Sequence, residues 1–165
     1  VKNGFISLLT NDYLKPRKDV NNWTQDVVDA LEAGDTEKFR KHLTSFLADI
    51  PYTMRRKETE RERERYFHYT FYLLMRMVSC YTVYTEKEQS EGRVDCIIEV
   101  PGYVYIFEFK LDGTADEALQ QIEDKGYARP YEADARKLYR IGVSFSSETG
   151  TVSDWKVVES NLAGR

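Results

Sequence analysis

Two acidic residues and a lysine stand inside two apolar segments that flank a Pro-Gly pair. Asp95 lies in the first segment, and Glu108 and Lys110 lie two residues apart in the second. Residues two apart on a strand point to the same face, so Glu108 and Lys110 would share one. Carboxylate oxygens are the ligands that a hard divalent cation prefers. The types and spacing of these residues therefore predict a metal site with a lysine beside it.

The position of Asp95 depends on how the two segments are joined. A tight turn centred on Pro101-Gly102 would place Asp95 opposite Glu108. It would also place Arg93 opposite Lys110. Opposed side chains have Cβ atoms about 4.5–5.5 Å apart, so the two carboxylates would repel each other unless a cation lay between them. A three-residue loop would instead shift the pairing by one residue and separate the acids.

Both faces of this predicted hairpin are apolar, which is typical of central strands covered by helices on each side. Alternation places Val94, Cys96, Ile98, Tyr105, Phe107 and Phe109 on one face and Ile97, Val104 and Ile106 on the other. Charged groups in such strands must be paired. A buried structural ion pair is therefore the alternative interpretation to a metal site.

A long helix is predicted before the hairpin, from about Arg56 to Tyr81. Its apolar stripe recurs at three- and four-residue steps and comprises Glu64, Phe67, His68, Phe71, Leu74, Met75 and Val78. Glu64 lies on this stripe and faces the core, which makes it a candidate for a third acidic residue of the site. The alternative is a residue at the edge of the stripe whose carboxylate extends to water.

The remaining elements predict a mixed sheet flanked by helices, an α/β fold. A strand from Tyr81 to Glu86 precedes the hairpin, and a helix from Ala115 to about Tyr127 follows it and carries Gln121. Two more strands are predicted over Lys137–Phe145 and Val152–Glu159.

The first part of the chain predicts a small helical extension, residues 1–52. One helix, from Asn22 to Ala33, is expected to stop at Gly34, and Asp35 or Thr36 can cap the next. We interpret the pair as a packing or linking module before a domain that covers residues 53–165.

Composition restricts the function classes further. The 165 residues include 24 basic and 28 acidic side chains and carry a net charge of −4, which excludes binding of nucleic acid by bulk charge. Two cysteines in apolar surroundings, no signal peptide and no apolar span predict a cytoplasmic chain that does not contact a membrane. With two histidines, a site that needs several of them is excluded. The chain begins with Val rather than Met, so we expect it to be part of a longer protein.

Together these motifs resemble the PD-(D/E)XK nuclease superfamily, which has the restriction-endonuclease-like fold. Its site combines a helix Glu, a strand Asp, an acid-x-Lys and often a Gln in the next helix. The matching residues are Glu64, Asp95, Glu108-Phe109-Lys110 and Gln121. The Pro that precedes the Asp in the superfamily is Val94 here. Over about residues 60–158 the sequence is similar to the C-terminal domain of an uncharacterised bacterial family in which an ATPase-like domain comes first. Residues 1–52 would then be the tail of that ATPase-like region.

The resemblance implies a nuclease domain, a hydrolase that cleaves phosphodiester bonds in nucleic acid, with DNA as the expected substrate and Mg²⁺ or Mn²⁺ as cofactor. Asp95 and Glu108 would hold the ion, and Glu64 a second ion or its water. Lys110 would stabilise charge on the phosphate, and Gln121 would position the lysine, the water or the phosphate.

Arg93 and Tyr127 are candidates for contacts with the substrate backbone, the alternatives being a structural ion pair and a core ring. The other functional hypothesis is a weakly active or inactive module that binds nucleic acid or protein and regulates an attached ATPase-like domain. RNA as the substrate, strand state, sequence specificity, endo or exo action and oligomeric state all stay open at this stage.

Overall fold

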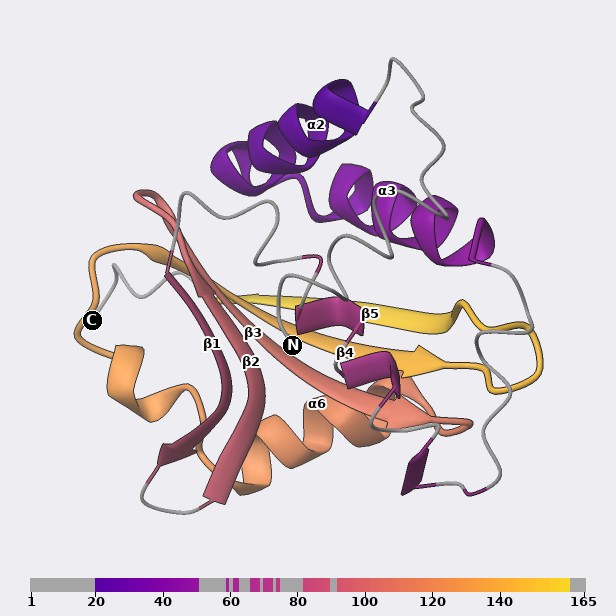
Figure 1. Cartoon of the computed structure of the whole chain (residues 1–165). Coiled ribbons are helices and arrows are strands. Elements are labelled where there is room, and N and C mark those ends of the chain that lie inside the picture. Colours follow the sequence, from indigo (N-terminus) through magenta and orange to yellow (C-terminus); the bar gives the residue numbers. More distant parts are fainter. Residues whose placement is uncertain are drawn as a thin grey trace.

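The structure is a computed structural model that describes residues 20–50, 59, 61–62, 66–68, 70–72, 74, 82–89 and 92–160. A five-stranded sheet forms its centre, with the strands in the order β1-β2-β3-β4-β5 (Figure 1). The strands are β1 (Thr82–Gln89), β2 (Gly92–Glu99), β3 (Tyr103–Leu111), β4 (Lys137–Phe145) and β5 (Val152–Ser160). β3 and β4 are parallel, and the other neighbours are antiparallel. A parallel pair needs a crossover connection, and the helix between β3 and β4 supplies it.

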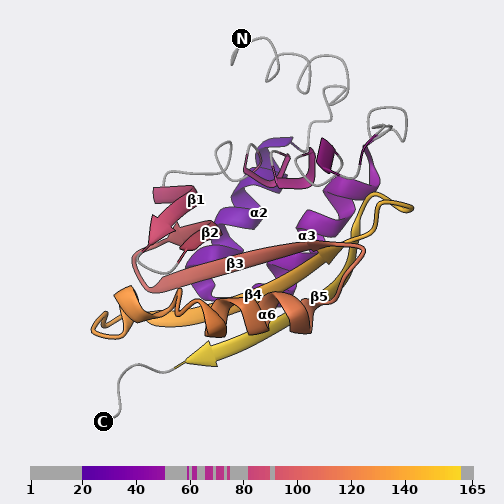
Figure 2. The ribbon, with the colours of Figure 1, turned by 90° about the horizontal axis from the view of Figure 1, so that it is seen from below.

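Helices cover both faces of the sheet, as Figures 1 and 2 show. On one face lie α2 (Val20–Ala33) and α3 (Thr36–Ala48), which share a core with the sheet. On the other lie α6 (Ala115–Asp124) and the short 3₁₀ helix η2 (Arg129–Tyr131). The predicted mixed sheet flanked by helices is therefore confirmed. The described residues within 61–74 are helical. Phe67, Phe71 and Leu74 belong to the core that α2 and α3 share with the sheet.

The turn between α2 and α3 follows the sequence prediction. Gly34 adopts φ 71, a left-handed conformation that ends α2 at low cost. Asp35 then caps α3 by accepting the Lys38 N–H at 2.9 Å. Two tyrosine hydroxyls from β3 fix this turn on the sheet, because Tyr105 donates to the Leu31 carbonyl at 2.6 Å. Tyr103 donates to the Ala33 carbonyl at 3.3 Å.

Aromatic packing makes α3 part of the core of the sheet. The ring of Phe39 lies 6.4 Å from that of Phe71, 5.8 Å from that of Phe107 and 6.1 Å from that of Trp155. The expected helical extension therefore forms one layer over the sheet. The domain boundary predicted between residues 52 and 53 stays a prediction.

The end of α6 differs from the prediction, which carried the helix to Tyr127. It stops at Asp124 because Gly126 takes φ 60. The Tyr127 N–H then bonds to the Ile122 carbonyl at 3.1 Å, and the Gly126 N–H to the Glu123 carbonyl at 3.0 Å. This pair of bonds is a Schellman motif. It turns the Tyr127 ring back beside Ile122 in the core under α6.

The face assignment of β2 and β3 is confirmed except at Val94. Cys96 and Ile98 pack toward α2 and α3, as predicted, and Ile97 packs toward α6. Val94 was expected beside Cys96 but is buried with Ile97 on the α6 side. The alternation breaks at Asp95, whose carboxylate accepts the backbone N–H of Phe109 in β3.

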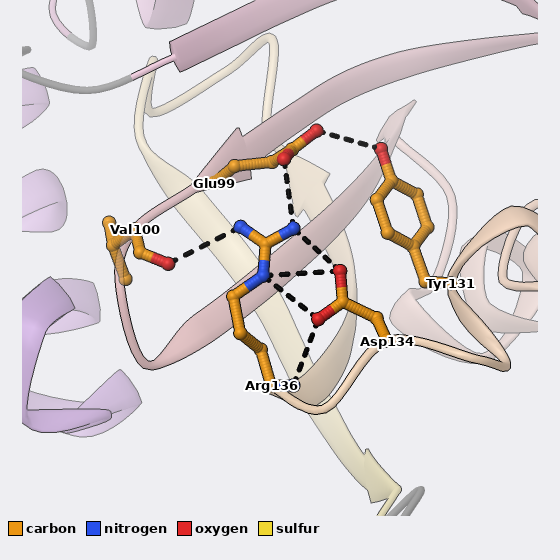
Figure 3. A network of polar contacts seen from close by, with 5 residues as sticks. All are labelled: Glu99, Val100, Tyr131, Asp134 and Arg136. Atoms are coloured by element: carbon orange, nitrogen blue, oxygen red, sulfur yellow. Dashed lines mark hydrogen bonds and ion pairs between the residues drawn. The ribbon is translucent and has the colours of Figure 1, made fainter.

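An arginine-centred network fixes the turn end of the hairpin (Figure 3). Arg136 donates to Asp134 at 2.6 Å and to Glu99 at 2.9 Å. It also donates to the Val100 carbonyl at 3.4 Å, and Tyr131 donates to Glu99 at 3.1 Å. The loop before β4 is therefore tied to the last residues of β2. Hydrogen bonds from Arg136 lower the pKa of Asp134, and the same bonds raise the pKa of Arg136.

Replacing Arg136 with Met should destabilise the fold, because two half-buried carboxylates would face each other without a cation. We expect a loss of about 1–3 kcal/mol in the free energy of unfolding, measured by urea denaturation at neutral pH. The loss should shrink as the pH falls below about 3.8, because the unfolded chain takes up a proton on Asp134 there while Arg136 keeps the folded carboxylate charged to lower pH.

Arg40→Met is the matched control, since Arg40 pairs with the exposed Glu37 within one helix. Such a surface pair contributes about 0–1 kcal/mol. Equal losses in the two variants would show that the network around Arg136 is not a stabilising clamp.

Candidate active site

The tight turn between β2 and β3 is centred on Pro101 and Gly102. Val100 and Tyr103 exchange backbone hydrogen bonds across it, at 3.0 and 3.3 Å. The ladder then runs back to the pair formed by Cys96 and Phe107. This is the register predicted from the sequence, and a three-residue loop is excluded. The next positions along the two strands are Asp95 and Glu108, which the register brings side by side.

Asp95 lies one residue beyond the last backbone pair of β2 and β3, and its side chain makes the next contacts between the two strands. Its Oδ2 accepts the backbone N–H of Phe109 at 2.9 Å. The Nε2 of His68 lies 3.8 Å from the same oxygen. The side chain is 17% exposed, so the carboxylate is largely withdrawn from water yet still reachable.

Glu108 is the most deeply buried acid of the site, with 2% exposure. Its Oε1 accepts a hydrogen bond from the side-chain amide of Gln121. Its Oε2 is buried and has no hydrogen-bond partner among the residues that the structure describes. Burial, followed by the charge of Asp95, raises the pKa of Glu108 to about 8, while Lys110 acts in the opposite direction. The two carboxylates are thus close enough to oppose each other's ionisation.

Lys110 and Gln121 complete a chain of contacts that leads from the sheet to α6. The Lys110 ammonium donates to Gln121 Oε1 at 2.5 Å, while the Gln121 amide nitrogen donates to Glu108. Gln121 therefore bridges the acid and the lysine. Its neighbour Gln120 is exposed and bonds to Asp124 at 2.7 Å. Gln121 rather than Gln120 faces inward, which agrees with the residue named from the superfamily's pattern.

Arg93 and Tyr127 are brought to the edge of the same region. The Tyr127 hydroxyl donates to the Arg93 carbonyl at 2.8 Å, and the Tyr127 side chain is buried. Burial and the charge of Glu108 raise the pKa of Tyr127. The Arg93 residue is exposed. Tyr127 is thus a core ring near the acids, as the structural alternative expected, and the substrate contact predicted for both residues stays a prediction.

The helix that precedes the sheet is only partly described. Glu64 lies outside the described residues, so its predicted place in the site is neither confirmed nor contradicted. His68, four residues later on the same stripe, does reach the site through Asp95. Its ring also lies 5.3 Å from that of Phe109. Sequence reasoning assigned His68 no role, although its helical spacing from Glu64 places both on one face.

The donor set fits a divalent cation held by few protein ligands. In the described part of the chain, no group of three or more His, Cys, Asp or Glu side chains is arranged to hold a metal. Mg²⁺, however, is often bound through one or two carboxylates and keeps several waters. Asp95 and Glu108 provide two carboxylates, one of them with a buried oxygen that lacks a partner in the described region. A cation would relieve both the repulsion and this unsatisfied oxygen.

Comparison with known proteins matches residues 62–155 to the PD-(D/E)XK nuclease superfamily. The chain is also 34% identical, over 162 residues, to a protein of Azotobacter chroococcum mcd 1 described as an uncharacterized protein in the vnfD 5′ region. That alignment covers 97% of this chain but 31% of the relative, so the chain spans about a third of the relative's length. The superfamily resemblance and the restriction-endonuclease-like fold class inferred from the motifs agree with the match. No helix among the described residues is long and apolar enough to span a bilayer.

Glu108→Gln should stabilise the metal-free protein at alkaline pH. The raised pKa means that folded Glu108 keeps a proton that the unfolded chain releases between pH 4.5 and about 8, so wild-type stability should fall over that interval. The amide does not ionise and should remove this loss. At pH 8.5 in chelator, we expect urea unfolding to show a gain of about 2–4 kcal/mol, because a tenfold change in acidity corresponds to about 1.4 kcal/mol.

The exposed Glu148 supplies the control, and Glu148→Gln should follow the wild-type pH profile. If Glu108→Gln and wild-type protein show parallel profiles between pH 5 and 9, Glu108 does not carry the strained charge described above.

Proposed function

Because the chain belongs to the PD-(D/E)XK nuclease superfamily, we propose that it is a divalent-metal-dependent nuclease domain that hydrolyses phosphodiester bonds in DNA. The observation that carries the proposal is the buried Glu108 carboxylate, which lies beside Asp95 and is bridged to Lys110 by Gln121. Two opposed carboxylates in an apolar sheet are costly unless their charge is compensated, and a bound cation would compensate it.

Asp95 and Glu108 are the proposed ligands of Mg²⁺ or Mn²⁺, and Glu64 is proposed to add a further carboxylate from the preceding helix. When bound, the ion would neutralise phosphate charge and acidify a water molecule. The Phe109 N–H orients Asp95 by donating to Oδ2, and the Gln121 amide orients Glu108 through Oε1. Glu108 Oε2 has no hydrogen-bond partner among the described residues, so it is the oxygen proposed to bind the ion.

Lys110 is proposed to stabilise the negative charge that develops on the phosphate oxygens during hydrolysis. Its ammonium is held by Gln121 Oε1, so it is oriented before substrate arrives. A preorganised cation needs little rearrangement at the moment of reaction, which is where its catalytic advantage lies. Exposed Arg93 is proposed to contact the substrate backbone, and Tyr127 to support it by holding the Arg93 carbonyl.

DNA cleavage should require Mg²⁺ or Mn²⁺ and stop on chelation, whereas Ca²⁺ should bind without supporting it. Lys110→Ala should lower the cleavage rate about 10²–10³-fold while metal binding persists, because an ammonium is not a ligand. Asp95→Ala should remove both cleavage and metal binding. Rates on plasmid, duplex, single-stranded DNA and RNA, together with calorimetric titration of Mn²⁺, test these outcomes.

Lys41→Ala is the control for loss of a lysine, since Lys41 is exposed on α3, on the other side of the sheet. It should cleave at the wild-type rate. Cleavage that survives in Asp95→Ala would identify a contaminating enzyme, and the absence of wild-type cleavage on every substrate would refute the nuclease assignment.

A second candidate function is a regulatory module that binds nucleic acid or protein next to an ATPase-like domain. The net charge of −4 favours it, because a nuclease without bulk positive charge must rely on local contacts for affinity. The relative's greater length is compatible with a further domain. In a full-length protein, a change in the rate of ATP hydrolysis on adding DNA, unaltered by Lys110→Ala, would favour regulation over cleavage.

A further inference from the structure

α6 approaches the sheet most closely at Gly142 of β4. A Cβ built on Gly142 would lie 2.1 Å from the Ala115 carbonyl oxygen and 3.1 Å from Leu119 Cγ. The first of these distances is far shorter than real Cβ contacts allow. Its partner is a backbone oxygen in the first turn of α6, which cannot move aside without the helix. The absence of a side chain at Gly142 therefore sets how near α6 lies to β4.

This contact is adjacent to the candidate site. Gly142 pairs with Glu108 in the parallel register of β3 and β4. The face of Gly142 that meets α6 is the same face from which Glu108 reaches Gln121. The helix that rests on Gly142 thus carries the amide that bonds to the neighbouring residue of the sheet.

The start of α6 is also fastened to the two last strands. Asp154 of β5 accepts the Ala115 N–H at 2.8 Å, and Ser144 of β4 donates to the Gly113 carbonyl at 2.9 Å. Lys156 of β5 bonds to Asp116 at 2.6 Å. These contacts hold the first turn of the helix against the sheet, and the bare backbone of Gly142 sets how closely that turn can approach β4. The resulting position of α6 is therefore defined from both directions.

A small displacement of α6 would be felt at Gln121. Ala115 and Gln121 are six positions apart, about 9 Å along a helix. Gln121 bonds to Glu108 and Lys110 at once, so a displacement of α6 away from the sheet would lengthen both hydrogen bonds. A displacement of about 1 Å would take the bond to Lys110 past the range of about 2.7–3.2 Å in which it is effective.

We propose that Gly142 is a positioning residue for the site. Its bare backbone lets α6 descend far enough for Gln121 to bridge Glu108 and Lys110. The structural part of this inference stands on the contacts above, and its consequence for catalysis rests on the proposed nuclease function. Because the limiting atom is the Ala115 carbonyl oxygen, trimming Leu119 would not restore the bridge once a methyl group is present at position 142.

The test compares Gly142→Ala with Gly102→Ala, a matched glycine whose added Cβ meets nothing within 4 Å. The direct readout is the ¹⁵N–¹H signal of the Gln121 side-chain amide, identified by its loss in Gln121→Leu. We expect Gly142→Ala to shift this signal toward that of a solvent-exposed glutamine, and Gly102→Ala to leave it in place. The double variant Gly142→Ala, Leu119→Ala should keep the shift.

Kinetics and metal binding separate positioning from a general loss of structure. In Gly142→Ala the kcat for DNA cleavage should fall about 10²-fold, as expected of a 1 Å misplacement. The increase in Tm on adding Mn²⁺ should stay within about twofold of wild type, because Asp95 and Glu108 lie on the sheet. Should Gly142→Ala not fold, Asp154→Ala carries the same test, since it releases the start of α6 without adding volume.

An unshifted Gln121 amide in these variants overturns the inference, whatever the activity. Full kcat in Gly142→Ala with a shifted amide overturns the catalytic role of the bridge. A wild-type protein that cleaves no substrate refutes the nuclease proposal alone, and the amide signal still decides whether Gly142 positions Gln121.

Discussion

The structure depends on one unfavourable arrangement, a carboxylate almost fully withdrawn from water beside a second carboxylate. Glu108 would be cheaper to bury as a neutral side chain, and the upward shift of its pKa expresses that cost. The fold offsets part of it through Gln121 and Lys110, on the α6 side of the sheet. The unsatisfied Oε2 shows that the compensation from the described residues is incomplete. Cation-binding sites have this character, because a bound ion supplies the positive charge that the surrounding protein lacks.

The layers of the fold give the site its rigidity in different ways. α2 and α3 pack aromatic and aliphatic side chains against one face of β3, so the strand that carries Glu108 and Lys110 cannot move toward them. α6 packs on the other face and adds a polar contact to the apolar ones. The acids come from the sheet and the amide comes from a helix. The proposed metal ligands and the group that orients the lysine consequently belong to two different layers.

The sequence was most informative where a local rule admits few solutions. Strand alternation and a two-residue loop were enough to place Asp95 beside Glu108, and β4 was predicted with its observed bounds, Lys137–Phe145. Gln121 was singled out by the superfamily's pattern, and the structure places its amide against Glu108. The superfamily resemblance used the same residues, and it agrees with the match over residues 62–155.

The errors lie where tertiary contacts override local rules. Val94 lies on the face opposite to the predicted one, next to Asp95, whose carboxylate bonds to the backbone of β3, a contact that no periodicity shows. α6 ended early because Gly126 supports a Schellman motif, a turn that the apolar pattern up to Tyr127 concealed. His68 was read as a core residue of its helix, since its approach to Asp95 is a tertiary contact that the helical pattern does not show.

The hairpin that carries Asp95 is fixed at both of its ends, and these contacts hold the register in which β2 pairs with β3. At the turn, Arg136 binds Glu99 and the Val100 carbonyl. Near the site, Asp95 binds the Phe109 N–H. A shift of one residue would turn every side chain of β2 to the opposite face, which would remove Asp95 from Glu108 and carry Glu99 away from Arg136. The same shift would move Cys96 and Ile98 out of the core that they share with α2 and α3. The contacts of the distant arginine therefore protect the spacing of the two acids, although Arg136 takes no part in their chemistry.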